Sequence, residues 1–174
     1  MPDAPSAMDY RLSYTYYNFP DNPSHLMDLD EIQARVSFPK ATGIDRLVPS
    51  YALVKLWPNS SGSLMSKASG FLHILMLDYE FAIPSLMLTS PEQTIRLHSE
   101  LIFNDGTDLL PRAPGSLRPA VDHDWSDLVI GAATDFALPY HITVTPSINY
   151  QISLESTVHN QNEVWATVGA LWRF

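Results

Sequence analysis

Apolar and polar residues alternate with a period of two over most of this chain. Successive side chains of a β-strand point to opposite faces, so each alternating run predicts a strand with one apolar and one polar face. The pattern predicts an all-β protein with about eight antiparallel strands. The runs are Asp9–Tyr16, Glu31–Phe38, Val48–Trp57, Phe71–Ile83, Gln93–Phe103, Trp125–Phe136, Tyr140–Ser153 and Glu163–Phe174.

The connections between these runs alternate in length. Long connections are expected near 18–30, 58–69, 104–124 and 154–162, and shorter ones near 39–47, 84–92 and 137–139. If the strands run up and down, all long connections lie at one end of the sheet, as they do in outer-membrane barrels. Prolines fall mostly between the runs, but Pro146 lies inside one. Since proline cannot donate a ladder hydrogen bond, a bulge or local break is expected there.

The composition indicates an apolar exterior. Charged residues make up 17% of the chain, below the roughly 25% of an ordinary soluble domain. The net charge of −9, with 10 scattered Lys and Arg residues, speaks against nucleic-acid binding. The absence of cysteine excludes disulfides and thiolate chemistry. No apolar run reaches the length of about 18 residues that a transmembrane helix needs.

The final run carries a specific signal. It alternates from Val164 onward and ends with Trp172, Arg173 and Phe174. This pattern resembles the C-terminal signal of outer-membrane proteins, which ends in an aromatic residue and is read by the barrel-insertion machinery. We therefore take Trp172 and Phe174 as the predicted membrane-insertion signal. The alternative is an ordinary terminal strand of a soluble sheet.

Five segments are similar to the TorF-like porin family: 9–17, 70–84, 101–106, 125–132 and 144–150. The resemblance implies a bacterial outer-membrane β-barrel with a passive-diffusion or envelope-structural role and no catalytic residues. Family members resemble barrels with a signal peptide and further N-terminal strands, which the printed residues do not supply. We expect residues 1–174 to form a single up-and-down transmembrane β-barrel domain, with residues 1–8 as a disordered N-terminal segment.

In such a barrel the apolar faces would meet lipid and the polar faces would line the interior. Charged interior residues should form paired networks, because a lone buried charge is costly. The expected partners are membrane lipid, lipopolysaccharide and the barrel-insertion machinery, without nucleic acid. The residues predicted to line the lumen are Arg11, Glu31, Arg35, Arg96, His98, Glu100, Glu163 and Arg173.

Two other functions compete with this interpretation. A soluble lipocalin-like barrel would enclose a small apolar ligand and turn its polar faces to water. An enzyme within a barrel would need paired catalytic side chains, but His98 and Ser99 are adjacent and point to opposite faces. Acidic clusters at 28–31 and 122–127 match no dedicated calcium loop. We therefore predict no catalytic residue, no cofactor and no bound metal.

Overall fold

The computed structural model of the chain describes residues 7–19, 27–61, 63–65, 68–84, 92–108, 121, 123–158 and 160–173. Their strands all belong to one antiparallel sheet. The nine strands are β1 (Asp9–Tyr17), β2 (Leu29–Ser37), β3 (Leu47–Pro58), β4 (Phe71–Pro84), β5 (Glu92–Asp105), β6 (Asp124–Thr134), β7 (Phe136–Leu138), β8 (Ile142–Ser153) and β9 (Glu163–Trp172).

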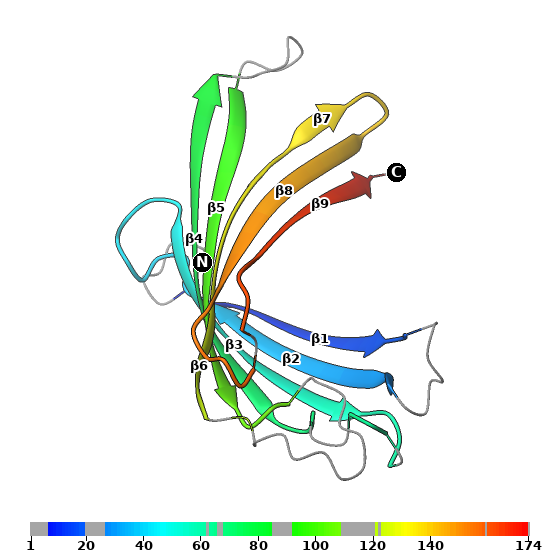
Figure 1. The fold of residues 1–174 in the computed structure, drawn as a ribbon. Helices are drawn as coiled ribbons and strands as arrows, with labels where there is room; N and C mark the ends of the chain where they lie inside the picture. Colours follow the sequence, from blue (N-terminus) through cyan, green and yellow to red (C-terminus); the bar gives the residue numbers. More distant parts are fainter. Residues whose placement is uncertain are drawn as a thin grey trace.

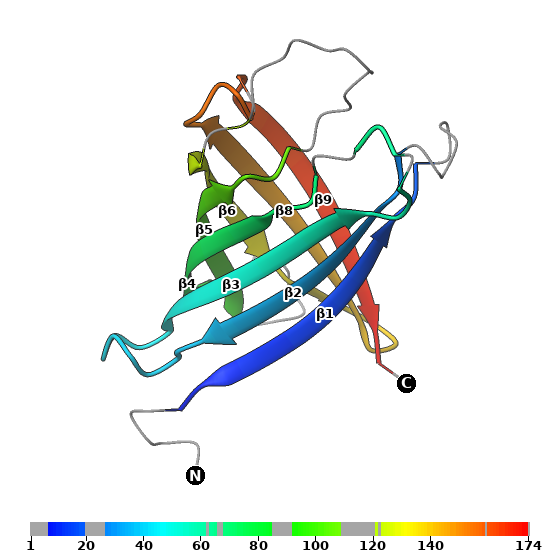
Figure 2. The same cartoon turned by 90° about the horizontal axis from the view of Figure 1, so that it is seen from below.

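The strands pair in chain order and the sheet curls into a half-barrel (Figure 1). Viewed from below, β1, β2 and β3 pass in front of β6, β8 and β9, with the concave side between them (Figure 2). The two outer strands, β1 and β9, do not pair with each other. The expectation of an all-β, antiparallel, up-and-down sheet is confirmed.

The short strand β7 continues the line of β6. The register in which Ala133 faces Ser147 carries on to Phe136 facing Val144 without a shift. By that register Thr134 lies opposite Pro146, which has no N–H to donate. The bulge or break expected at Pro146 is not observed, because β8 runs through this residue; the interruption falls instead at Asp135, in the neighbouring strand. Counting β6 and β7 as one interrupted strand gives the predicted number of about eight.

The turn between β7 and β8 is tight. Tyr140 and His141 both have positive φ angles, 64° and 60°, and these left-handed conformations let the three residues 139–141 reverse the chain. We expected the next strand to begin at Tyr140, but it begins at Ile142, because these turn conformations cannot join a ladder. The other predicted ends differ from the observed ones by no more than two residues.

The connections fall at the two ends of the sheet as predicted, although 154–162 and 38–46 are equally long. Residues 18–28, 59–70, 106–123 and 154–162 connect strands at one end, which we call the long-connection end. Residues 38–46, 85–91 and 139–141 connect strands at the opposite, short-connection end. The predicted disordered segment falls largely on residues 1–6, outside the described residues. Among the described residues no helix is long and apolar enough to cross a membrane.

Two hydrophobic clusters lie towards the long-connection end. Ala52, Val54 and Leu56 of β3 pack with Ile74 and Met76 of β4, and all five are buried. A second cluster joins Leu29 at the start of β2 to Met65 and Ala68 of the connection between β3 and β4. That connection therefore packs onto the end of the sheet and anchors it.

Candidate functional site

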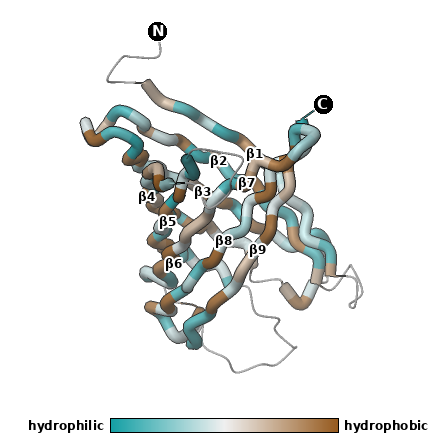
Figure 3. The backbone as a smooth tube through the Cα atoms, turned by 90° about the horizontal axis from the view of Figure 1, so that it is seen from above, coloured by the Kyte–Doolittle hydropathy of each residue, from teal (hydrophilic) through white to brown (hydrophobic). Residues whose placement is uncertain are grey.

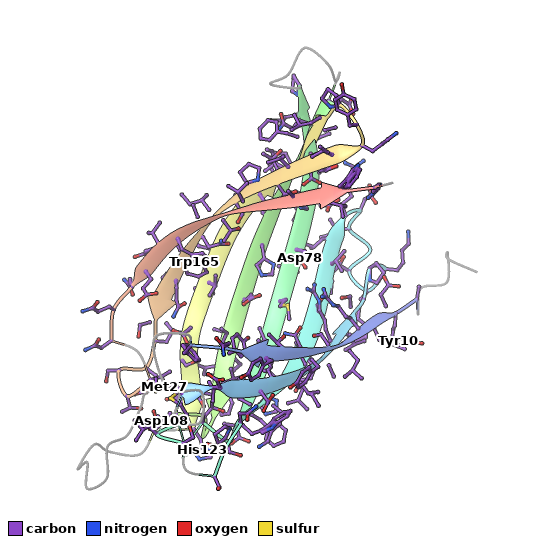
Figure 4. All side chains as sticks on the ribbon, turned by 90° about the vertical axis from the view of Figure 1, so that its right-hand side faces the viewer. Tyr10, Met27, Asp78, Asp108, His123 and Trp165 are labelled. Carbon is purple, nitrogen blue, oxygen red and sulfur yellow. The ribbon has the colours of Figure 1, made fainter. Side chains whose placement is uncertain are left out.

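The sheet has two chemically different faces. Alternation along each strand and the cross-strand register assign every residue to one of them. Figure 4 looks through the open side and shows Asp78 inside the curve, between β9 with Trp165 and β1 with Tyr10. We call the face that carries Asp78 the concave face, and the opposite one the outer face. Along the strands in Figure 3, hydrophobic and hydrophilic residues alternate.

A chain of ionic contacts crosses the concave face. The Arg35 Nη2 atom of β2 donates to Asp78 Oδ2 of β4 at 2.9 Å. His98 of β5 lies between two carboxylates, with Nδ1 2.5 Å from Asp78 Oδ1 and Nε2 2.7 Å from Glu100 Oε1. Carboxylates accept hydrogen bonds, so both ring nitrogens can donate together only in the imidazolium form. We call Arg35, Asp78, His98 and Glu100 the strap.

A second ion pair lies nearer the short-connection end. Arg96 of β5 makes a two-pronged contact with Asp135, at 2.6 Å and 2.8 Å. Thr145 of β8 donates its hydroxyl to the same carboxylate at 2.5 Å. Asp135 is the residue at the break between β6 and β7, where it is not part of a described strand. The break therefore places a carboxylate where it joins β5 to β8 across the intervening strand.

The structure brings together half of the residues predicted to line the lumen. Arg35, His98 and Glu100 belong to the strap, and Arg96 is bound to Asp135. The others, Arg11, Glu31, Glu163 and Arg173, share the concave face by alternation, towards the open edges of the sheet.

The carboxylates that pair with these cations were missed. Asp78 lies in a run that is apolar on both faces, so its side was not assigned from the pattern. Its even spacing from Ile74 and Met76, which share its face, is a signal that could have placed it. Asp135 had a signal too, because its even spacing from Gly131 places it on the polar face of its run, and the unshifted register keeps it there.

The outer face carries an exposed apolar band. Side chains from neighbouring strands present Leu75, Leu77, Leu97, Ile130 and Ile148 with 43–58% of their surface accessible. A shallow apolar groove of about 630 Å³ crosses this band, with Ser99 and Ala132 among its smaller lining residues. Such a continuous apolar surface on a folded chain indicates contact with lipid or with another apolar surface.

Aromatic rings form a ladder on the outer face towards the long-connection end. Tyr51 of β3, His73 of β4, Phe103 of β5 and Trp125 of β6 follow one another with centroid separations of 5.4–6.1 Å. The Tyr51 hydroxyl lies 2.6 Å from His73 Nδ1. The ladder emerges from the register, which aligns these residues across four neighbouring strands.

The outer face of the edge strand β1 carries tyrosines that cover two carboxylates. Tyr14 donates its hydroxyl to Asp30, and Tyr16 donates its hydroxyl to Asp28. The two aspartates are 7% and 1% exposed. The acidic cluster at 28–31 is therefore hydrogen-bonded within the fold, and the described residues contain no group of side chains arranged to hold a metal ion. Asp122 of the other acidic cluster lies outside the described residues.

The predicted insertion signal is described only in part. Trp172 is the last residue of β9 and is 65% exposed, while Phe174 lies outside the described residues. Every residue of β9 is exposed, which agrees with its place at the open edge.

Comparison of the chain with protein-family models, with curated proteins and with solved structures gave no significant match. The resemblance to TorF-like porins therefore stays a prediction.

Proposed function

We propose that this chain is the folded part of a bacterial outer-membrane β-barrel with a porin-like passive-diffusion or envelope-structural role and no enzymatic activity. The observation that carries the proposal is the polarity of the two faces. The outer face exposes an apolar band, and the concave face holds the ion-paired strap. Lipid on the outside and water on the inside is the environment in which both faces are favourable.

The distribution of aromatic side chains supports the same proposal. The ladder from Tyr51 to Trp125 lies on the outer face towards the long-connection end. At the short-connection end, Tyr79 stacks on Phe81, and Tyr140 lies in the turn before β8. Aromatic rings at both edges of an apolar band are typical of the membrane–water interfaces of barrels.

A soluble lipocalin-like carrier is the alternative, and the polarity argues against it. Such a carrier needs an apolar cavity inside the curve and a charged exterior. Here the concave face of β3 and β4 has no such cavity, because Val54, Ile74 and Met76 pack against one another and are buried. The large apolar groove lies on the outer face instead.

Spanning lipid also requires partners for the backbone groups of β1 and β9, because unpaired N–H and C=O groups are costly in hydrocarbon. Closure of about eight strands on themselves would fill the interior with side chains, whereas additional strands would leave a water-filled channel. Both forms fit the proposal. The filled barrel corresponds to the envelope-structural role, and the wider barrel corresponds to the passive-diffusion role.

Heat-modifiable gel mobility tests the proposal. The chain is refolded in detergent micelles and, in parallel, in plain buffer, and each sample is run with and without heating. A fast-migrating form that depends on detergent and disappears on heating is expected. A stable monomer in plain buffer without a mobility shift would contradict the membrane barrel and favour a soluble carrier.

A further inference from the structure

At the short-connection end, the concave face contains a polar pocket of about 430 Å³. It is lined by Arg46, Val48, Asp78, Glu80 and Arg96. Two guanidinium groups and two carboxylates therefore face one small space. Under the proposed function this space opens to the water-filled side of the sheet.

Two of these four charges are already bound. Asp78 holds Arg35 and His98 of the strap. Arg96 is held by both oxygens of Asp135. These contacts neutralise Asp78 and Arg96 within the fold, so they offer a passing solute little net charge.

The other two charges are not committed. Arg46 contacts Asp45 at 3.6 Å, with 52% and 91% of the two side chains exposed, and such a surface pair contributes little. Among the described residues, the Glu80 side chain has no hydrogen bond or close ion pair; its charge attracts Arg96, which lies opposite it in the register but is bound to Asp135. The pocket thus presents one available cation and one available anion.

These two residues are neighbours in the sheet, yet their side chains do not pair. The Glu80 N–H donates to the Arg46 carbonyl at 3.3 Å. Arg46 has a φ of 62°, a left-handed conformation that residues other than glycine rarely adopt. The backbones of the two residues are therefore held side by side, and both residues line the same pocket.

We propose that this pocket is a binding subsite for small zwitterionic solutes, with the solute carboxylate on Arg46 and its ammonium group on Glu80. The proposal rests on the proposed function, because it needs a concave face in contact with water. A guanidinium binds a carboxylate through two parallel charge-assisted hydrogen bonds. A solute with a single charge would leave one of the two groups without a partner, so a zwitterion is favoured over an anion, a cation or a neutral molecule.

Four probes with the same three-carbon skeleton test this preference: L-alanine, L-lactate, L-alaninamide and L-lactamide. Binding to the full chain refolded in micelles is measured by titration, with ligand-observed saturation-transfer NMR. Alanine should bind most tightly. Arg46→Ala and Glu80→Gln should each weaken alanine binding at least about tenfold, the loss expected for a charge-assisted hydrogen bond. The charge exchange R46E/E80R should restore it.

The control variant is Lys40→Ala, an exposed lysine in the same connection as Arg46 that does not line the pocket. It should leave alanine binding unchanged. Equal binding of alanine and lactamide, or undiminished alanine binding in Glu80→Gln, would overturn the subsite. The variant Glu80→Gln keeps the size of the side chain, so a folding defect in Arg46→Ala would not remove the test.

Failure of the subsite and failure of the proposed function give different results. Entry of lactamide into vesicles that contain the protein reports a membrane pore and does not depend on Arg46 or Glu80. A chain that inserts and admits lactamide, but does not prefer alanine, would contradict the subsite alone. A water-soluble chain that still binds alanine through Arg46 and Glu80 would support the pocket and contradict the membrane setting.

Discussion

Leu75 and Met76 are neighbours in β4, yet the fold treats them oppositely. Leu75 is 48% exposed on the outer face, and Met76 is 6% exposed on the concave face. The enclosed face also holds the strap, whereas the exposed face holds the apolar band. Curvature, rather than hydrophobicity, decides which side is enclosed. The comparison teaches that packing within this chain buries apolar side chains on the concave face but leaves those on the outer face exposed.

The largest effect should separate these two neighbours. Met76→Ala leaves a cavity in the packed cluster and should lower the free energy of unfolding by about 2–5 kcal/mol. Leu75→Ala removes a side chain with few protein contacts and should cost less than about 1 kcal/mol. Urea unfolding of the refolded chain in micelles, followed by tryptophan fluorescence, gives both values. Equal losses of unfolding free energy in the two variants would contradict the different burial of the two faces.

A charge placed on each face should sharpen the comparison. Ile148 lies on the outer face in the middle of β8, and Asn149 follows it on the concave face. Ile148→Arg should destabilise the chain in lipid vesicles by about 2–4 kcal/mol, the cost of arginine on the lipid side of a barrel at mid-depth.

Asn149→Arg is the matched control. It faces Gly131, over which the Asn149 amide now lies, and its charge would point to the concave side, so it should cost less than Ile148→Arg. Stability is measured by denaturant titration in vesicles. An arginine that is tolerated at 148 and harmful at 149 would reverse the assignment of the two faces.

A smaller effect is expected from the strap. Asp78→Ala removes the acceptor shared by Arg35 and His98. Because all three side chains are about 30% exposed, the expected loss is about 1–2 kcal/mol. Asp78→Asn keeps one acceptor oxygen and should lose less. Urea midpoints in micelles check the order, and an unchanged midpoint for Asp78→Ala would show that the strap does not stabilise the sheet.

Much of the fold was predictable because alternation is a local property. Each predicted run overlaps most of an observed strand, but the break expected at Pro146 falls at Asp135 in the neighbouring strand. The tight turn was expected, but its exact place was not. Tyr140 and His141 adopt left-handed conformations, which these residue types do not favour and which the sequence therefore did not indicate. The curvature that leaves β1 and β9 apart depends on the whole sheet, so no single run of residues encodes it.

The candidate site was predictable in part. Arg35, Arg96, His98 and Glu100 could be assigned to one face from alternation. Alternation also places Asp135, the partner of Arg96, on that face, whereas Asp78 lies in a strand without clear alternation. The pocket of Arg46 and Glu80 was missed as well, because it depends on the conformation of a connection and on the neighbouring strand.

The two unpaired edge strands make the newly synthesised chain prone to association with other chains. An open edge offers a row of free N–H and C=O groups on which any other chain can add a strand. The edge strand β9 contains neither lysine nor proline, the residues that commonly discourage such addition. Refolding yield should therefore fall as protein concentration rises, and a chaperone that covers β1 or β9 until the final partner arrives should restore it.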